Sequence, residues 1–387
     1  MGEEEVTVDS GLIFALSEGI GPRPPTSDRE RVAAEVIAAE MEKLGLQSTV
    51  EQFDSQRSFG PTYLVIFGLA LLSGALSRKS RAAGTVAGFA AASLGAAESG
   101  FALWSPLNLL RRGRSQNVWA SIEPAELDQD RSRTICLVSH MDSSRSGLMF
   151  HPKATPFLGR FSTASGIALM INALAPLLDW SAPGRWLLKG VRALIGASAA
   201  LILERELRGE DVAGANDNAS GVAACLILAR HFGEAPLEHS RLVVLVTGSE
   251  ESGVIGMREF LKKNDTEGWL FINFDGVSAD APLRVLSREG GLAGSKADPD
   301  LIAAAAEVSR EHPELAAEPL MDGSGLPYDA TAVNARGGKA ITIANQGDGP
   351  ILNYHWPTDT AANISRQSFA RAVRFAAALV RKLDDQD

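Results

Sequence analysis

The stretch that decides the fold class is Thr134-Ile135-Cys136-Leu137-Val138-Ser139-His140-Met141-Asp142. Its first five residues form a short, nearly continuous apolar run, and residues 242–247 form another. Such runs are expected for strands that helices cover on both faces. In an open α/β sheet, ligands gather beyond the carboxyl ends of these strands. His140 follows the first run, and Glu250 and Glu251 follow the second, so the sequence predicts a site at this edge of the sheet.

Helical patterns alternate with these strands. Residues 32–46 repeat apolar side chains at three-and-four spacing and stop at Gly45, which predicts an amphipathic helix with a glycine cap. Residues 48–53 are predicted to follow as a strand, residues 220–232 as a helix, and residues 365–383 as a closing amphipathic helix. The predicted fold class is therefore α/β, with a single catalytic domain over residues 1–387.

Composition narrows the function. With 45% hydrophobic and 22% charged residues, the chain has the makeup of a folded protein. The net charge of −10 and the lack of a basic stripe argue against nucleic acid as a partner. Cys136 and Cys225 lie in apolar runs and are expected to be small buried side chains. The acidic start, Met-Gly-Glu-Glu-Glu, predicts no cleavable secretory signal.

Two apolar stretches, residues 58–110 and 157–205, do not fit a compact sheet. Residues 58–77 carry no charge, a basic run follows at 78–81, and residues 82–110 carry only Glu98. The second stretch repeats this plan more weakly on either side of residues 179–185. We expect two apolar helical hairpins inserted into the catalytic domain.

The surroundings of these hairpins stay open at this point. A membrane-spanning helix needs roughly 20 apolar residues, and one segment reaches that length. A stripe of small residues at Gly84, Gly88, Ala92 and Ala96 is frequent in membrane helices. The alternative is a soluble helical cap or dimerisation element. The predicted localisation is thus membrane-associated, with a soluble cytoplasmic protein as the alternative, and a homo-oligomer stays open.

Five potential metal ligands occur along the chain: His140, Asp217, Glu251, Asp275 and His355. Imidazole nitrogens and carboxylate oxygens without a thiolate suit zinc or a similar divalent ion in a hydrolytic site. Their order suggests two metal ions that share one carboxylate. The pattern predicts a metallohydrolase.

The motifs around these residues resemble the di-zinc aminopeptidases of the M28 type. The similar pieces are Asn117-Val118-Trp119-Ala120, Leu137-Val138-Ser139-His140-Met141-Asp142, Gly214-Ala215-Asn216-Asp217-Asn218-Ala219-Ser220-Gly221, Glu250-Glu251, Asp275, Tyr354-His355 and Thr358-Asp359-Thr360. The Ala-Asn-Asp-Asn-Ala-Ser-Gly run, together with Glu-Glu and a late Tyr-His, is highly specific. The resemblance implies a three-layer α/β/α fold with a mixed sheet.

The resemblance also implies a role for each residue. Asp217 would bridge two zinc ions, His140 and Asp275 would complete one site, and Glu251 and His355 the other. Glu250 would be the general base, taking a proton from the attacking water. Asp142, which we also group with the catalytic residues, would accept a hydrogen bond from the His140 imidazole and fix its tautomer.

Other polar residues receive weaker or no roles. Asp280, Asp322 and Asp329 are acidic loop candidates near the site, and Asp329 follows Tyr328 where a supporting role fits. Four histidines lie outside the motifs of the five ligands and are expected on helices or the surface: His151, His231, His239 and His312. One departure from the family stands out, because 77 positions separate His140 from Asp217, where the family has a short segment. The second apolar stretch fills that interval and puts substrate size and access in question.

The leading interpretation is a zinc-dependent aminopeptidase that acts on peptide substrates. A carboxypeptidase or amidohydrolase could use the same two ions. A related branch of the family acts as glutaminyl cyclase with a single zinc, whereas this chain keeps residues for both sites. The non-enzyme alternative is a membrane scaffold with an inherited peptidase fold, although such scaffolds usually lose ligands or the base.

Overall fold

The computed structural model describes residues 6–125, 133–290, 294–320, 325–347 and 351–386. In this part of the chain, eight strands form one mixed sheet in the order β1-β2-β4-β3-β5-β10-β6-β9. The four central strands, β4, β3, β5 and β10, run parallel. Strand β2 pairs antiparallel with β1 and β4, and β6 pairs antiparallel with β10 but parallel with β9. The bounds of the sheet strands are β1 Thr49–Ser55, β2 Gly113–Ile122, β3 Thr134–His140, β4 Arg241–Thr247, β5 Leu270–Phe274, β6 Leu283–Leu286, β9 Glu318–Leu320 and β10 Lys339–Asn345.

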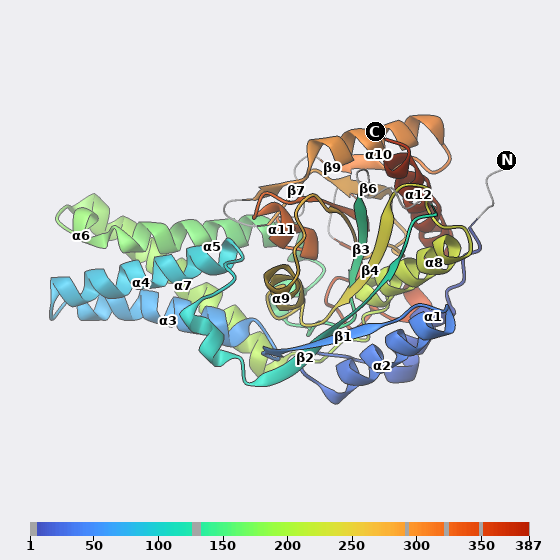
Figure 1. The fold of residues 1–387 in the computed structure, drawn as a ribbon. Helices are drawn as coiled ribbons and strands as arrows, with labels where there is room; N and C mark the ends of the chain where they lie inside the picture. Colours follow the sequence, from blue (N-terminus) through green and yellow to red (C-terminus); the bar gives the residue numbers. More distant parts are fainter. Residues whose placement is uncertain (1–5, 126–132, 291–293, 321–324, 348–350, 387) are drawn as a thin grey trace.

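Helices cover both faces of this sheet (Figure 1). One face packs against α1 Gly11–Phe14, α2 Asp28–Lys43, α8 Ser220–Glu234, α10 Pro299–Glu311 and α12 Arg366–Asp384. The other packs against α9 Ile255–Lys263 and α11 Asp329–Asn334. The strand β3 is buried at every residue because its alternating side chains enter both cores. The predicted three-layer α/β/α class is confirmed.

The predicted elements agree with the structure to within a few residues. The helix expected at 32–46 begins earlier, at Asp28, because Ser27 caps it and accepts a hydrogen bond from the Glu30 amide. Gly45 follows that helix at a φ of 78°, as the glycine cap predicts. His140 is the last residue of β3 rather than the residue beyond it. Cys136 and Cys225 are both buried and free.

Five helices extend from the sheet as an elongated helical arm: α3 Gly60–Leu76, α4 Arg81–Ser99, α5 Leu158–Ala173, α6 Ala175–Leu178 and α7 Ala182–Arg208 (Figure 1). The arm has its own apolar core, which includes Ile66, Ala91, Leu169 and Ile195. Small residues allow its helices to approach closely. A Cβ at Gly84 would lie 2.8 Å from the Ser73 carbonyl oxygen, so only glycine fits at this crossing of α4 with α3.

Buried ion pairs join the arm to the sheet domain. Arg258 of α9 donates to Glu98 of α4 over 3.0 Å, and Arg258 is only 2% exposed. Arg205 of α7 is likewise buried and donates to the Ser58 hydroxyl and to the Arg145 carbonyl. These contacts fix the arm beside the edge of the sheet where the candidate site lies.

Candidate metal centre

Two residues, Gly214 and Asn218, fix the backbone conformation of the loop that carries Asp217. Gly214 lies at a φ of 62°, and a Cβ there would come within 2.5 Å of the Asp217 carbonyl oxygen. The Asn218 amide donates to the Phe274 carbonyl at 2.7 Å and its oxygen accepts from the Gly221 amide at 3.0 Å. The loop is therefore tied to the end of β5 and to the first turn of α8, which begins at Ser220.

The five predicted ligands come from separate segments that meet at the carboxyl edge of the sheet. His140 ends β3, Asp275 follows β5, and Glu251 follows β4 by four residues. Asp217 precedes α8, and His355 lies in a turn far along the chain at a φ of 49°. All five are buried. They meet at the carboxyl ends of the parallel strands, where ligands bind in open α/β sheets.

Asp217 stands between two groups of side chains. Its Oδ1 lies 3.2 Å from Nε2 of His140, which in turn lies 3.4 Å from Oδ2 of Asp275. Its Oδ2 lies 3.2 Å from Nε2 of His355, which lies 3.0 Å from Oε1 of Glu251. Each carboxylate oxygen of Asp217 thus belongs to a different group of three potential ligands.

These separations fit zinc coordination. Tetrahedral ligands at about 2.1 Å from zinc lie about 3.4 Å from one another, close to the distances between the nitrogen and oxygen atoms of each group. Among the described residues, Oε1 of Glu251 is buried without a hydrogen-bond partner. A buried acceptor of this kind costs free energy unless a cation or donor satisfies it. The donor set therefore suits divalent metal ions.

Charge supports the same assignment. Burial and the negative charge of Asp217 raise the pKa of Asp275 to about 6. Burial alone would lower the pKa of His355, but the carboxylates of Glu251 and Asp217 raise it to about 9. Burial also opposes protonation of His140, whereas the nearby carboxylates of Asp142, Asp217 and Asp275 raise its pKa well above the usual value. The cluster holds excess negative charge that bound cations would neutralise.

Glu250 and Asp142 lie at the same place. Glu250 is 9% exposed, and burial is the main reason that its pKa is raised well above the usual value. The charge of His140 lowers this pKa, and the charge of Glu251 raises it further. The Asp142 carboxylate accepts the backbone amides of Glu250 at 3.1 Å and Glu251 at 3.0 Å. The hydrogen bond of His140 Nδ1 goes to the main-chain carbonyl of Asp142 at 3.1 Å, while the carboxylate oxygen lies 3.7 Å away. Asp142 therefore orients the Glu250-Glu251 turn through its carboxylate and the imidazole through its backbone.

Three buried residues that support the site received no role from the sequence. The Asp359 carboxylate accepts the amides of Asn216 at 2.7 Å and Asp217 at 3.1 Å. Glu30 accepts the Ser249 amide at 2.9 Å and so holds the turn after β4. Arg23 donates to five carbonyl oxygens, those of Leu16, Gly21, Met141, Ala213 and Gly214. The flanking Thr358-Asp359-Thr360 motif was a signal for Asp359, but Glu30 and Arg23 lie in an ordinary amphipathic helix and a proline-rich turn.

The remaining candidates lie around this centre. Asp329 accepts a hydrogen bond from the Thr247 hydroxyl at 2.6 Å, and burial raises its pKa to about 7. Asp280 is exposed, and Asp322 lies outside the described residues. The four histidines without assigned roles stay outside the two ligand groups. His231 on α8 contacts Arg381, His312 follows α10, His151 packs edge-on against Trp356, and His239 precedes β4.

The chain is similar to known peptidases. The model of peptidase family M28 matches residues 200–380. The resemblance to family M28 is confirmed. A match to a peptidase family supports a hydrolase. No curated protein matches the sequence.

Solved structures share the fold. A zinc aminopeptidase from Bacillus subtilis superposes with a TM-score of 0.59 at 14% identity, covering 98% of this chain and 96% of that one. An aminopeptidase from Aneurinibacillus sp. gives 0.58 at 15% identity, with 96% and 93% covered. A glutaminyl cyclase from Bacteroides thetaiotaomicron gives 0.55 at 12% identity, with 99% and 100% covered. At these identities the likeness shows the fold alone.

Proposed function

We propose that this chain is a zinc-dependent peptidase that holds two metal ions and hydrolyses amino-terminal peptide bonds. The observation that carries the proposal is the position of Asp217, whose two oxygens face two separate groups of ligand atoms. His140 and Asp275 would complete one site, and Glu251 and His355 the other. Two bound ions would lower the pKa of a shared water and polarise the scissile carbonyl.

The protein's own groups supply the proton transfers. Glu250 follows β4 in the same turn as Glu251 and lines the cavity that opens beside His355. Its carboxylate would take a proton from the attacking water and deliver it to the leaving amine. A raised pKa suits this role, because an acid–base group works best when its pKa lies near the operating pH.

The general-base assignment is tested with Glu250→Gln. This variant keeps the size of the side chain and the Asp142 hydrogen bonds to the backbone, so metal content should stay at two ions per chain. Hydrolysis of amino-acid amides should fall by about 10²- to 10⁴-fold. Metal analysis and kcat/KM on the same preparation separate the two effects. Full activity in Glu250→Gln would show that another group is the base.

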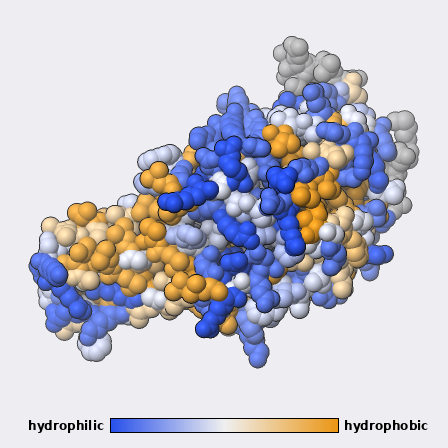
Figure 2. Space-filling view, turned by 90° about the horizontal axis from the view of Figure 1, so that it is seen from below, coloured by the Kyte–Doolittle hydropathy of each residue, from blue (hydrophilic) through white to orange (hydrophobic). Residues whose placement is uncertain are grey.

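We also propose that the helical arm contacts a membrane. Sixteen of the 21 exposed large apolar side chains among the described residues lie in residues 58–110 and 157–208. Figure 2 shows this apolar surface along the arm, with polar residues at its tip. Helix α7 is long and apolar enough to cross a bilayer, and only 28% of its apolar window is buried. Monomeric soluble proteins rarely expose so large a contiguous apolar surface.

The tip of the arm has the character of a membrane interface. Trp180 and Trp186 are 77% and 70% exposed, and Lys189 lies 4.1 Å from the Trp186 ring centre. Tryptophan and basic residues concentrate where hydrocarbon meets water. Cell fractionation tests the proposal: the chain should pellet with membranes and need detergent for release. Recovery of the full chain as a monodisperse species without detergent would contradict it.

A further inference from the structure

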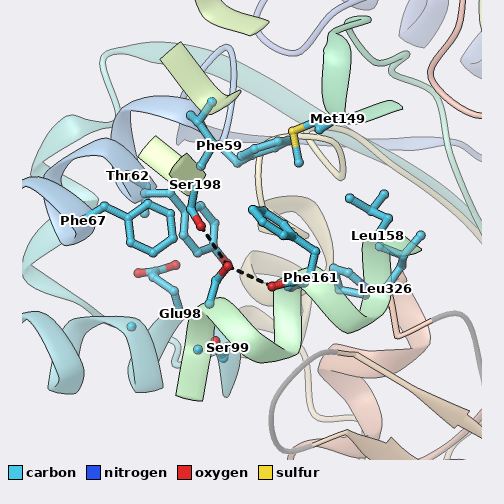
Figure 3. Close-up of a pocket in the computed structure, with 18 of the residues that line it drawn as sticks. Phe59, Thr62, Phe67, Glu98, Ser99, Met149, Leu158, Phe161, Ser198 and Leu326 are labelled. Carbon is cyan, nitrogen blue, oxygen red and sulfur yellow. Dashed lines mark hydrogen bonds between the residues drawn. The ribbon is translucent and has the colours of Figure 1, made fainter. Parts of the chain in front are cut away.

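An apolar cavity of about 230 Å³ runs between the arm helices and ends at the candidate metal centre. Glu250, Glu251 and His355 belong to its lining, together with residues of α3, α4, α5 and α7. Met149 and Leu326, which lie outside the arm helices, also line it (Figure 3). A single water needs only about 10–15 Å³, so this is no packing defect. The cavity is continuous with the reacting groups, and the arm helices and the loops around the centre line it together.

On α5 and α4, the residues that line this cavity lie on one face of the helix. Its lining on α5 follows helical spacing, through Leu158, Phe161, Ser162, Ser165, Gly166, Leu169 and Met170. On α4, the lining at Ala92, Gly95, Ala96 and Ser99 has the same spacing and consists of small residues, which leave room rather than fill it. The cavity thus depends on which side chains face it, and larger residues there would close it.

Several polar groups in the lining are already satisfied by protein partners. Ser165 donates to the Phe161 carbonyl at 2.8 Å and lies 2.8 Å from the Ser198 hydroxyl (Figure 3). Thr62 exchanges hydrogen bonds with Gln56, and Glu98 is paired with Arg258. Phe59, Phe67 and Phe161 supply aromatic walls. Such a lining favours a hydrocarbon chain over a peptide backbone, whose amides need partners when buried.

The cavity also reaches the outer surface of the arm. Met170 lines it and is 42% exposed on the apolar face of α5. A hydrocarbon chain of a ligand could therefore enter the cavity from the membrane interior without crossing water. This access agrees with the membrane contact proposed for the arm.

A second cavity, of about 340 Å³, lies beside the first, and its lining mixes polar and apolar surface. It shares Glu251 with the first cavity and is lined by Arg57, Arg112 and Arg145. Arg57 and Arg145 both bond to the one carboxylate of Asp211, at 2.8 and 3.0 Å. Arg205 in the same lining pairs with Glu206. With exposed Arg112, the four arginines of the lining outnumber its three carboxylates, Asp211, Glu206 and Glu251, and this surplus suits an anionic group.

We propose that the substrate is a long-chain N-acyl amino acid. This inference rests on the two-metal amide hydrolysis proposed above but replaces its amino-terminal specificity, because the amine of this substrate carries the acyl group. The acyl chain would occupy the apolar cavity, the amide would lie beside Glu250, and the carboxylate would face the arginines. Water adds its hydroxyl to the acyl carbon, the C–N bond breaks, and the nitrogen leaves with the proton. The products are a fatty acid and a free amino acid.

Binding of N-acylglycines with 2 to 12 acyl carbons to the zinc-loaded Glu250→Gln chain tests this without turnover. Equilibrium dialysis below the micelle concentration should show affinity rising up to about fourfold per methylene until the cavity is filled. The neutral dodecanoyl amide should bind more weakly than dodecanoylglycine, and Arg112→Gln should remove that difference. Equal affinity at every chain length would overturn the proposal.

Matched variants test whether the acyl chain of the ligand occupies the apolar cavity. Leu201→Trp adds bulk to the cavity lining, whereas Leu203→Trp makes the same change at an exposed position of α7 outside it. Leu201→Trp should reduce the long-to-short affinity ratio at least about tenfold, because several methylenes lose their site. Leu203→Trp should leave the ratio unchanged. Ala96→Phe inside the lining and Ala97→Phe outside it repeat the comparison on α4, in case the first variant misfolds.

Turnover by the unmodified chain separates this inference from the proposed function. Hydrolysis of dodecanoylglycine in preference to acetylglycine and amino-acid amides supports the acyl substrate. Hydrolysis of amino-acid amides without any gain from an acyl chain overturns the inference and leaves the peptidase proposal standing. Tight binding of acylglycines with no hydrolysis of any amide overturns both.

Discussion

The sheet domain and the helical arm differ in how far they bury their apolar side chains. In the sheet domain, strands and helices bury their apolar faces in two cores, and β3 is enclosed at every residue. In the arm, the core is small and most of the exposed large apolar side chains of the described residues remain outside it. The difference teaches that the sheet domain covers its apolar faces with its own elements, whereas the arm leaves apolar faces that the proposed membrane contact would cover.

The largest predicted effect belongs to the sheet domain alone. Asp217→Ala removes the carboxylate that belongs to both ligand groups, so both ions should be lost and hydrolysis should fall by at least about 10⁴-fold. Metal analysis and amide hydrolysis measure the two losses. Membrane association should be unchanged, since the arm does not contain Asp217. Loss of membrane binding in this variant would mean that the two regions are not independent.

The next effect concerns the contact between the regions. Glu98→Ala leaves the buried guanidinium of Arg258 without its charge partner, and such a loss costs about 3–5 kcal/mol. Glu307→Ala is the matched control, because Glu307 is 41% exposed and its ion pairs with Arg310 and Lys382 should contribute at most about 1 kcal/mol. Denaturant unfolding compares the two. Equal, small losses would mean that the arm is not held by this pair.

A third prediction uses pH within the sheet domain. Burial raises the pKa of Glu289 from 4.5 to about 7, so its contribution to stability is full below pH 4.5 and is lost as pH rises through 7. Glu289→Gln cannot ionise and keeps an acceptor for the Thr331 hydroxyl. Relative to the unmodified chain, it should gain up to about 3 kcal/mol on going from pH 5 to pH 8. Thermal unfolding at both pH values measures this, and a pH-independent difference would refute it.

The smallest effect concerns orientation within the site. Asp142→Asn weakens the acceptor for the amides of Glu250 and Glu251 while leaving every proposed ligand in place. Outer partners of this kind are worth about 10- to 100-fold in activity or metal affinity. The kcat and zinc affinity of this variant should therefore fall less than those of Asp217→Ala. A loss as large as that of Asp217→Ala would place Asp142 among the ligands.

The same contrast explains what the sequence could predict. The α/β class could be predicted from short apolar strands followed by polar residues. The five proposed ligands could be selected because each lies in a distinctive motif. Glu30 and Arg23 escaped selection because their roles depend on carbonyls and amides brought close only by the fold. That the apolar stretches are insertions into a family framework stays a prediction.

The arm shows a second limit of sequence patterns. Its helices were predicted from apolar runs and the basic turn, and the stripe of small residues indicated close packing. The cavity could not be foreseen, because it depends on which faces of four helices meet beside Glu250. Periodicity gives the faces of one helix but not the rotation of one helix against another.

The central claim is that Asp217 and the four ligands around it form one binuclear zinc centre that hydrolyses amides. Its most direct test is to strip the purified chain with a chelator and titrate zinc back while following amide hydrolysis. The account predicts an inactive apo chain, binding of about two zinc ions per chain, and recovery of activity as they bind. Activity that persists in the metal-free chain would contradict it, as would saturation at one ion with full activity.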